Sequence, residues 1–478
     1  MTEFVSKVIK DPIHGFIDFN GKQENDLKLL LSDPFFQRLR RVKQLGFSDY
    51  VFPSAAHSRF SHSLGVYSIA KRMLTVVESN GINGEWSRKG QACLAAALLH
   101  DVGHGMFSHA FENAMKFFLK RNSLEPSRQV AFKEAVNHEK VSQKIITDSS
   151  IAKALRDLGG DGFPTMVCDM IKKTDKNCVY TSIVSSQLDA DRLDYAQRDA
   201  YFAGVSSGGI DLDWLIRNFK KAKNGEAEFL YVGSKAYISL EQFTVTLFHL
   251  YPTIYLHKKT RGLEYMFALL LSRVFELIAS GAEKQAGISS DHPFVRFFNE
   301  PHNLDHALLL DDTVFWGSLH QLRTAPDASI KWIADQLSAR KIFQSIDVWK
   351  ILDQAAVSRS AVQKLPAGQR VRKFDEICEQ VCKEITGDGS PWADDCYYDT
   401  YDRPIYKPRD VEGGHPQQIN VEVGGQIRDI ASISPLVASA ASFNIHRIHY
   451  DESKFSRVDN LTSEIRKLVA AKLDDLEV

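Results

Sequence analysis

The chain has 478 residues, of which 44% are hydrophobic and 25% are charged, and its formal net charge is −1. This length favours two or three domains, and the composition is typical of a globular protein. The nearly neutral charge excludes a global positive field that would draw the chain onto nucleic acid or an anionic membrane. We therefore expect a partner that is recognised locally, such as a small molecule bearing phosphate.

No segment has the character of a membrane anchor, and the cysteines favour a reducing compartment. The start, MTEFVSKVIKDP, has no apolar run of signal-peptide length, and CLAAALL and MFALLL are too short to span a bilayer. Six cysteines are scattered along the chain, and Cys378 and Cys382 have no second Cys/His pair to complete a zinc site. We expect a cytoplasmic protein that has no contact with a membrane.

The first 290 residues have mainly helical periodicity. Helices are predicted over 63–77, over the Ala/Leu-rich segment 89–99, and over 263–278, which is apolar nearly all round and typical of a central core helix. Another apolar stripe, formed by Leu39, Val42 and Leu45, follows the breaker Pro34. Alternation over 228–238 predicts a short hairpin that turns at Gly233-Ser234.

The composition shifts near residues 293–306, where a second region is expected to begin. Trp332, Ile333 and Leu337 form the apolar face of a further helix, and 388–425 is rich in Gly, Pro, Asp and Tyr with a strand-like INVEV run. We predict a mainly α protein, with a helical core over residues 1–290 and a smaller α+β region over residues 300–478.

Four segments concentrate the residue types of a metal centre. They are HSRFSH (57–62), LLHDVGHGMFSH (98–109), Asn137-His138-Glu139 and QLDADRLDYAQRD (187–199). Adjacent residues in mid-helix point about 100° apart, so His100 and Asp101 share a ligand only near a helix end, for which Gly103 is a suitable place. A buried Asp101 would be costly without a cation. The simpler alternative is that Asp101 caps a neighbouring helix and His100 is a core histidine.

The acidic segment fits a mixed metal site better than a calcium loop. A calcium loop starting at Asp189 would need Gly where Asp194 stands and Glu where Ala200 stands, so this interpretation fails. On a helix, Asp191 and Asp194 share one face, although acidic faces are usually only solvated. A shell of histidines and carboxylates suits a divalent ion and leaves positions for water, whose pKa such an ion lowers towards about 7.

These segments, together with KDPIHG, FQRLRRVKQLG, FPSAAHSRFSHSLGV and LDADRLDYAQRDAYFAG, resemble the HD-domain dNTP triphosphohydrolases. The resemblance covers about residues 5–280, and LLLDDTVFW and INVEV extend it more loosely. It reaches the animal sterile-alpha-motif/HD-domain enzyme but is closer to bacterial relatives that lack the additional domain. It implies an HD phosphohydrolase core over 1–290, with 300–478 serving regulation or oligomerisation.

The resemblance implies metal-dependent hydrolysis of deoxynucleoside triphosphates to deoxynucleoside and inorganic triphosphate, through attack of water on the α-phosphorus. Carried over residue by residue, one ion of iron, manganese, magnesium, zinc, cobalt or nickel is held by His62, His100, Asp101 and Asp191. The catalytic residues implied are His109, His138 as general acid, and Glu112 to orient one of them. The substrate contacts implied are Arg59, His104 and Arg192 for phosphate, Gln44, Leu45, Tyr195 and Asp199 for the sugar, and Tyr255, Lys258 and Arg261 in place of an arginine of the animal enzyme.

The resemblance also implies a homo-oligomer, dimeric or tetrameric, because regulatory nucleotide sites in this family lie between subunits. Lys7, Val8, Gln37 and Arg40 match such a site. Ser32 and Phe16 replace its base-selecting aspartate and stacking histidine, so we expect a nucleotide activator without the guanine specificity.

Two alternatives stay open. An HD phosphohydrolase could act on another substrate, such as a ribonucleotide, a cyclic nucleotide, an alarmone or a nucleic-acid end, although the neutral charge disfavours long nucleic acid. A nucleotide-sensing protein could keep the site for binding alone. Identified hydrolysis products distinguish all three.

Overall fold

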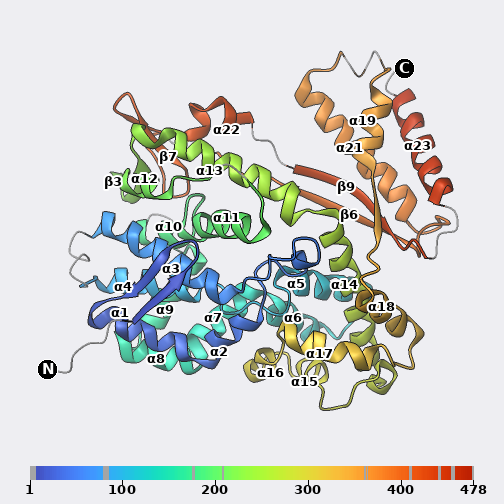
Figure 1. Ribbon diagram of the computed structural model, residues 1–478, viewed down its shortest axis with the longest axis horizontal. Helices are drawn as coiled ribbons and strands as arrows, with labels where there is room; N and C mark the ends of the chain where they lie inside the picture. Colours follow the sequence, from blue (N-terminus) through green and yellow to red (C-terminus); the bar gives the residue numbers. More distant parts are fainter. Residues whose placement is uncertain are drawn as a thin grey trace.

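The computed structural model describes residues 7–78, 85–174, 178–206, 209–359, 362, 364–408, 412–439, 443–453 and 458–475. A helical body carries a small sheet on one side, and a lobe of three helices stands at one end, joined to the body by two long strands (Figure 1). The prediction of a mainly α protein is confirmed. Within the described residues, no helix combines the length and apolar character needed to cross a bilayer.

A β-hairpin near the amino terminus lies against the helical body. β1 (Lys7–Asp11) pairs antiparallel with β2 (Gly15–Phe19), and Gly15 takes the positive φ of 73° at the turn, a conformation that glycine adopts without strain. Asp11 and His14 flank this turn, and the Asp11 carboxylate accepts the backbone N–H of His14 at 3.0 Å. The turn therefore has a defined shape, which matters for the site described below.

The apolar residues that follow Pro34 do not form one helix, so that prediction is wrong. α2 (Pro34–Arg38) gives way to a 3-10 turn (Leu39–Arg41), and Val42 is already extended, with φ −115° and ψ 112°. Leu39 and Val42 are buried all the same. The Val42 carbonyl accepts the N–H of Arg59 at 2.9 Å, so the segment is held by a distant part of the chain.

The first hydrophobic cluster surrounds α3, which packs against α4 and α11. The predicted helices over 63–77 and 89–99 are confirmed, since α3 and α4 contain them. Every side chain of α4 from residue 92 to residue 99 is fully buried, which explains its Ala/Leu-rich sequence. The helices of this part are α1 (Gly21–Leu27), α3 (Arg59–Val77), α4 (Arg88–Leu99), α7 (His138–Asp148), α8 (Ser150–Gly159), α9 (Phe163–Lys172), α10 (Val179–Val184), α11 (Ala190–Ala203), α12 (Leu212–Arg217) and α13 (Tyr237–Leu250).

A second cluster forms around α14 (Lys258–Ala279), which packs against α5 and α18. Met266, Phe267, Leu270 and Val274 have no exposed surface, which confirms the predicted central core helix. The other helices here are α5 (His109–Arg121), α6 (Pro126–Val136), α15 (Pro293–Asn299), α17 (Asp312–Leu322) and α18 (Ala328–Ser338), whereas Leu304 and Leu308 of α16 (Leu304–Leu308) pack against the first cluster. The predicted apolar face near Trp332 lies on α18.

The predicted hairpin is present, but it lies one strand earlier than expected. β3 (Phe219–Asn224) and β4 (Ala227–Val232) pair across a turn of Gly225 and Glu226, where Gly225 has φ 58°. The expected turn at Gly233-Ser234 is wrong, because Gly233 is extended and leads into α13. A two-residue hairpin turn favours glycine with positive φ at its first position, and Gly225 supplies it directly after β3, which outweighs the alternation further on.

Strands from the carboxyl-terminal half complete two sheets. β7 (Asn420–Val423), which contains most of the INVEV run, pairs in parallel with β4 and antiparallel with β8 (Gln426–Asp429), and α22 (Pro435–Ser439) follows. A second sheet, ordered β5-β9-β6, is formed by β5 (Gln344–Asp347), β6 (Cys396–Arg403) and β9 (Phe443–Tyr450). Against it, α19 (Val348–Ala356), α21 (Ala367–Thr386) and α23 (Val458–Asp474) form a third cluster, the lobe of Figure 1.

The division of the chain at about residue 300 stays a prediction. The second cluster contains side chains from residue 47 to residue 343, whereas the third contains only residues after 345. From Leu310 onward, the segment 300–343 therefore packs within the same core as α5 and α14. It contributes directly to the surroundings of the site.

Substitution Leu270→Ala should lower the free energy of unfolding by about 2–5 kcal/mol, because it empties a fully buried position in α14. The matched control Leu29→Ala removes a side chain that is 63% exposed and should change it by less than about 0.5 kcal/mol. Urea denaturation of the two variants measures the difference. Equal losses would contradict the packing described for α14.

Candidate metal and catalytic site

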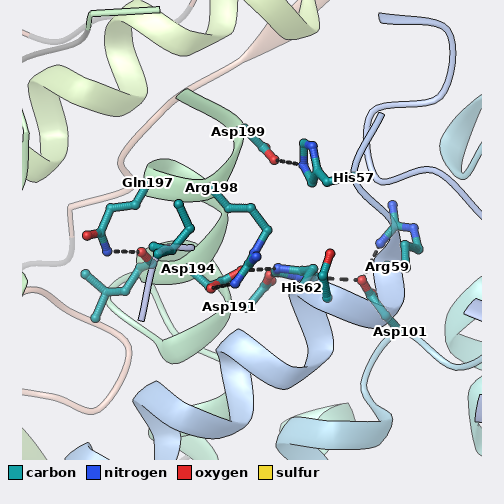
Figure 2. A network of polar contacts seen from close by, with 12 residues as sticks. His57, Arg59, His62, Asp101, Asp191, Asp194, Gln197, Arg198 and Asp199 are labelled. Atoms are coloured by element: carbon teal, nitrogen blue, oxygen red, sulfur yellow. Dashed lines mark hydrogen bonds and ion pairs between the residues drawn. The ribbon is translucent and has the colours of Figure 1, made fainter. Parts of the chain in front are cut away.

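Three helix ends bring the four predicted metal ligands together. α3 places His62 on its first turn, where it has no exposed surface. α4 ends just before His100 and Asp101, so the helix end that this pair requires is confirmed. α11 carries Asp191 in its first turn. In Figure 2, Asp191 and Asp101 approach His62 from different elements.

Nitrogen and oxygen atoms of these four residues face one another over short distances. His62 Nε2 lies 3.3 Å from His100 Nε2, 3.1 Å from Asp191 Oδ1 and 3.7 Å from Asp101 Oδ2. His100 Nε2 lies 3.4 Å from Asp101 Oδ2 and 3.8 Å from Asp191 Oδ1. Ligands about 2 Å from one ion lie about 3 Å apart in adjacent positions. His62, His100 and Asp191 therefore have the spacing that one divalent ion requires, with ligand atoms all within 4.8 Å of one another, and Asp101 adjoins both histidines.

The local charges also favour a cation. Burial alone would lower the pKa of His62, but its hydrogen bonds with Asp191 and Asp194 raise that pKa to about 10. Burial alone would raise the pKa of Asp191, but the hydrogen bond with His62 and the charges of His100 and His62 together outweigh burial, and the net shift is downward. The carboxylates thus stabilise positive charge between them, as a metal-binding site must.

Asp194, one turn after Asp191, orients His62 from behind. One of its oxygens, Oδ2, lies 2.7 Å from His62 Nδ1, which leaves Nε2 of that ring for the site. The other, Oδ1, lies 2.5 Å from His14 Nε2, and the Arg198 guanidinium bonds both oxygens. Arg198 in turn bonds both oxygens of Asp11. Through Asp194 and Arg198, the turn of the β1–β2 hairpin is thereby connected to His62, a candidate metal ligand.

From the sequence, no role was assigned to this supporting network. His14 lies in KDPIHG and Asp194 in LDADRLDYAQRDAYFAG, but nothing local connects residues that are 180 positions apart. One signal is a glycine inside an apolar helix. A Cβ atom added at Gly65 of α3 would lie 1.9 Å from Asp194 Oδ1, so only glycine allows α11 to approach so closely.

Three histidines and Glu112 form a second cluster beside the first. α5 begins at His109 and places Glu112 one turn later, where its Oε1 lies 3.7 Å from His109 Nδ1 and bonds His138 Nδ1. The His104 and His138 rings stack with their centroids 3.9 Å apart. The predicted proximity of Glu112 to these histidines is observed, and the two clusters adjoin because His104 Nε2 lies 3.4 Å from Asp101 Oδ1.

Glu112 is held in its ionised form. Burial alone would raise its pKa, but hydrogen bonds from His109 and His138 lower it well below the usual range. A carboxylate of this kind keeps a proton on Nδ1 of His138 and leaves Nε2 of that ring free for proton transfer. Ligand atoms of all four residues lie within 4.8 Å of one another, so this cluster also has the composition to hold an ion.

The loop that carries His104 has a strained backbone. Phe107 and Ser108 have φ values of 52° and 58°, in a region that costs an L-residue about 1–2 kcal/mol. The Ser108 hydroxyl does not cap α5; it donates to the Lys43 carbonyl at 2.7 Å and accepts from Arg59 Nε at 2.6 Å. Asp312, from α17, accepts the N–H groups of Phe107 at 2.7 Å and of Lys43 at 3.0 Å. These contacts hold the loop in its unusual conformation.

Most of the predicted phosphate contacts lie at the two clusters. Arg59 is buried, and its NH1 atom bonds Asp101. His104 is also buried, and burial, followed by the charge of Arg59, lowers its pKa well below the usual range, so it is a neutral imidazole. Arg192 is half-buried in the first turn of α11, one residue after Asp191.

The predicted sugar contacts centre on Asp199. Its Oδ2 accepts the hydroxyl of Tyr255 at 2.7 Å, and its Oδ1 lies 2.8 Å from Nε2 of His57, a residue expected to be structural (Figure 2). The Tyr195 and Tyr255 rings meet edge to face. Gln44 is half-buried and has an Oε1 atom with no hydrogen-bond partner among the described residues, and Leu45, also half-buried, follows it.

Lys258 and Arg261, the two predicted phosphate contacts after Tyr255, differ in their surroundings. Lys258 lies exposed in the first turn of α14. Arg261 is bound by Asp399 at 2.6 Å and by Glu264 at 2.8 Å. The expectation that Arg261 reaches a phosphate is therefore wrong, because β6 supplies a carboxylate that the sequence could not place beside it.

The comparisons with known proteins agree with this arrangement. The HD domain matches residues 59–198, which run from α3 into α11. Uncharacterized protein YwfO of Bacillus subtilis is 33% identical over 346 residues, which cover 71% of this chain and 72% of that protein. The chain belongs to the HD-domain family. The family resemblance noted in the sequence is thus confirmed.

Two further similarities of this HD-domain protein bear on its chemistry. The deoxynucleoside triphosphate triphosphohydrolase SAMHD1 of Mus musculus is 27% identical over 413 residues, which cover 79% of this chain and 57% of the mouse protein. The crystal structure of a phosphohydrolase from Bacteroides thetaiotaomicron is 26% identical with a TM-score of 0.67, and the match covers 93% of this chain and 100% of that one.

The stability of this HD-domain protein should depend on pH through Asp312. Burial raises the pKa of this carboxyl to about 6 from its model-compound value of 3.8. Because the folded state then binds its proton more tightly than the unfolded state, the group contributes stability below about pH 4 that is lost as the pH rises through about 6. Relative to Asp312→Asn, the wild type should lose about 3 kcal/mol of unfolding free energy between pH 4 and pH 7. Denaturation curves across this range measure it, and parallel profiles would contradict the assignment.

Proposed function

We propose that this protein is a metal-dependent phosphohydrolase that converts deoxynucleoside triphosphates to deoxynucleoside and inorganic triphosphate. The observation that carries the proposal is the convergence of His62, His100 and Asp191, with Asp101 at 3.4 Å from His100 and 3.7 Å from His62, beside a second cluster suited to proton transfer. The match to the HD domain and the similarity to the mouse dNTP triphosphohydrolase support it.

The four ligands would hold one divalent ion of iron, manganese, magnesium, zinc, cobalt or nickel. Such an ion, when bound, lowers the pKa of water towards about 7 and offsets phosphate charge. The two histidines and two carboxylates contribute a charge of −2, so the loaded site is neutral before a triphosphate arrives. Arg59, His104 and Arg192 would then bind the phosphate oxygens. Phosphoryl transfer depends mainly on such positioning and charge stabilisation.

The second cluster would supply the proton for the leaving group. Glu112 stays ionised and bonds Nδ1 of His138, which orients that imidazole. Nε2 of His138 can then donate its proton to the 5′-oxygen that leaves the α-phosphorus. His109, at the start of α5 with its side chain 66% exposed, is placed to contact the same phosphate from the solvent side.

Selection of the sugar would fall to the residues around Asp199. The Asp199 carboxylate accepts hydrogen bonds and is fixed from two sides by His57 and Tyr255. An acceptor of this kind, with the unpartnered Gln44 Oε1, suits a 3′-hydroxyl, and the tyrosine wall would exclude a 2′-hydroxyl. Leu45 would contact the sugar or base, while Lys258 would need to extend from α14 to reach the triphosphate.

The remaining parts of the proposal concern assembly. We propose a homo-oligomer, dimeric or tetrameric, with a nucleotide activator bound near the β1–β2 hairpin and the residues after 300 serving regulation or assembly. Val8 and Phe16 of that hairpin are 50% and 65% exposed, and Arg40 lies over the Phe60 ring while bonding Gln37. Exposed apolar side chains suit a contact between subunits.

Hydrolysis assays test the proposal directly. The full chain, loaded with manganese and given each dNTP singly and in mixtures, should release deoxynucleoside and triphosphate in equal amounts, as identified by chromatography. Asp191→Asn should lower turnover by about 10³-fold, because it removes a charged ligand of the ion. The matched control Asp213→Asn, whose side chain is 79% exposed, should leave turnover unchanged.

The same assay separates the alternatives. Pyrophosphate or orthophosphate as the only product, or faster turnover of a ribonucleotide or cyclic nucleotide than of every dNTP, would assign this site to another phosphohydrolase reaction. Binding of metal and dNTP without products, with or without other nucleotides present, would make the protein a nucleotide sensor.

A further inference from the structure

α17, which begins within the LLLDDTVFW segment, contacts the strained loop that carries His104. This helix lies outside the residues that the HD domain matches. Asp312, the first residue of α17, is 4% exposed and has its carboxylate between two segments of chain. Its Oδ1 accepts the N–H of Phe107 and its Oδ2 accepts the N–H of Lys43, so both oxygens bond backbone amides about 205 and 269 positions away. A carboxylate that bonds only main-chain groups fixes backbone positions.

From Lys43 the hydrogen bonds continue to the metal ligands. The Lys43 carbonyl accepts the Ser108 hydroxyl, and Ser108 Oγ accepts Arg59 Nε. Arg59 NH1 bonds Asp101 Oδ2. An unbroken series of contacts therefore leads from α17 to the carboxylate expected to bind the ion. It passes through the loop between α4 and α5 that carries His104 and Ser108.

Two more contacts tie the same loop to the same segment. Arg38, which is 4% exposed, donates from NH2 to the carbonyl of His104 at 2.6 Å and to the carbonyl of Leu310 at 3.2 Å. The Phe107 ring packs edge to face against Phe315 of α17, with centroids 5.2 Å apart. The loop is thus held at the main chain of His104 and at the ring of Phe107, one of its two residues with positive φ.

We propose that Asp312 is a positioning residue of the catalytic site and that α17 holds the strained loop in its productive conformation. The inference rests on the proposed function, because the productive geometry is that of the phosphohydrolase site. Without the carboxylate, the N–H groups of Phe107 and Lys43 lose their shared acceptor and the positive φ values at Phe107 and Ser108 lose their support. The loop would then relax and move His104, His109 and Arg59 away from the reacting phosphate.

Asp312→Asn tests the inference. The asparagine side chain has nearly the shape of the carboxylate, but its NH2 group would face one of the two backbone N–H groups. Both groups are donors, so one of the two hydrogen bonds is lost. We expect kcat to fall by about 10²-fold while KM changes by less than about threefold, because misplacement near the reacting atoms affects the transition state most. In hydrogen exchange, amides in 102–110 and 42–45 should exchange about tenfold faster, with the rest of the chain unchanged.

The matched control is Asp327→Asn. Asp327 caps α18 and pairs with Arg273 at 2.7 Å, so its loss destabilises a helix of the same cluster without touching the loop. It should lower the unfolding midpoint as Asp312→Asn does, with kcat unchanged. Asp312→Glu, which keeps the charge and displaces it by one methylene, serves if the asparagine variant does not fold.

Three results would overturn the inference. They are an unchanged kcat in Asp312→Asn, faster exchange spread over the whole chain, and an equal loss of kcat in Asp327→Asn, which would make the effect one of stability. If the wild-type protein hydrolyses no nucleotide, the proposed function fails by itself. In that case hydrogen exchange of Asp312→Asn still tests whether Asp312 holds the loop. Faster exchange confined to 102–110 and 42–45 supports this role of Asp312, and unchanged exchange contradicts it.

Discussion

The arrangement of the site depends on burying several charges at the contact between α3 and α11. Asp194 has no exposed surface and bonds His62, His14 and Arg198 together. A buried carboxylate is costly unless its hydrogen bonds are satisfied, so each of these partners is required once the aspartate is inside. Gly65 provides the space for it. The fixed ring of His62 then defines where an ion can lie.

The candidate metal site is therefore a consequence of helix packing as much as of ligand chemistry. α3, α4 and α11 converge because their apolar faces share one cluster, and the proposed ligands lie at helix ends where the backbone is not fully paired. Positions at helix ends allow neighbours such as His100 and Asp101 to face one point. Second-layer partners such as Asp194 typically affect metal affinity nearly as much as the ligands do.

Parts of the chain far from the HD domain complete its surroundings. β7 joins the sheet begun by β4, Asp399 of β6 binds Arg261 of α14, and Asp312 of α17 bonds the loop after α4. The site thus draws on residues before, within and after the matched domain. LLLDDTVFW, which extends the family resemblance, thus has a structural link to the candidate site through Asp312.

The sequence predicted the elements that depend on local signals. Apolar periodicity identified α3, α4 and α14, and the family resemblance supplied the four proposed metal ligands that the structure brings together. Prediction from the sequence failed where distant contacts decide, and it missed one local turn signal. Val42 is extended because it pairs with Arg59, whereas the hairpin turns at Gly225 because its first turn position needs a positive φ. The His14–Asp194 and Phe107–Asp312 contacts join residues 180 and 205 positions apart, and no local pattern reports them.

The most direct test of the account is the location of the metal. Crystals of the protein grown with manganese, and measured for anomalous scattering, should show one ion per chain bound by His62 Nε2, His100 Nε2, Asp101 and Asp191, with His62 Nδ1 still bonded to Asp194. An ion bound instead by His104, His109, Glu112 and His138, or no ordered ion at the four ligands under saturating manganese, would contradict it.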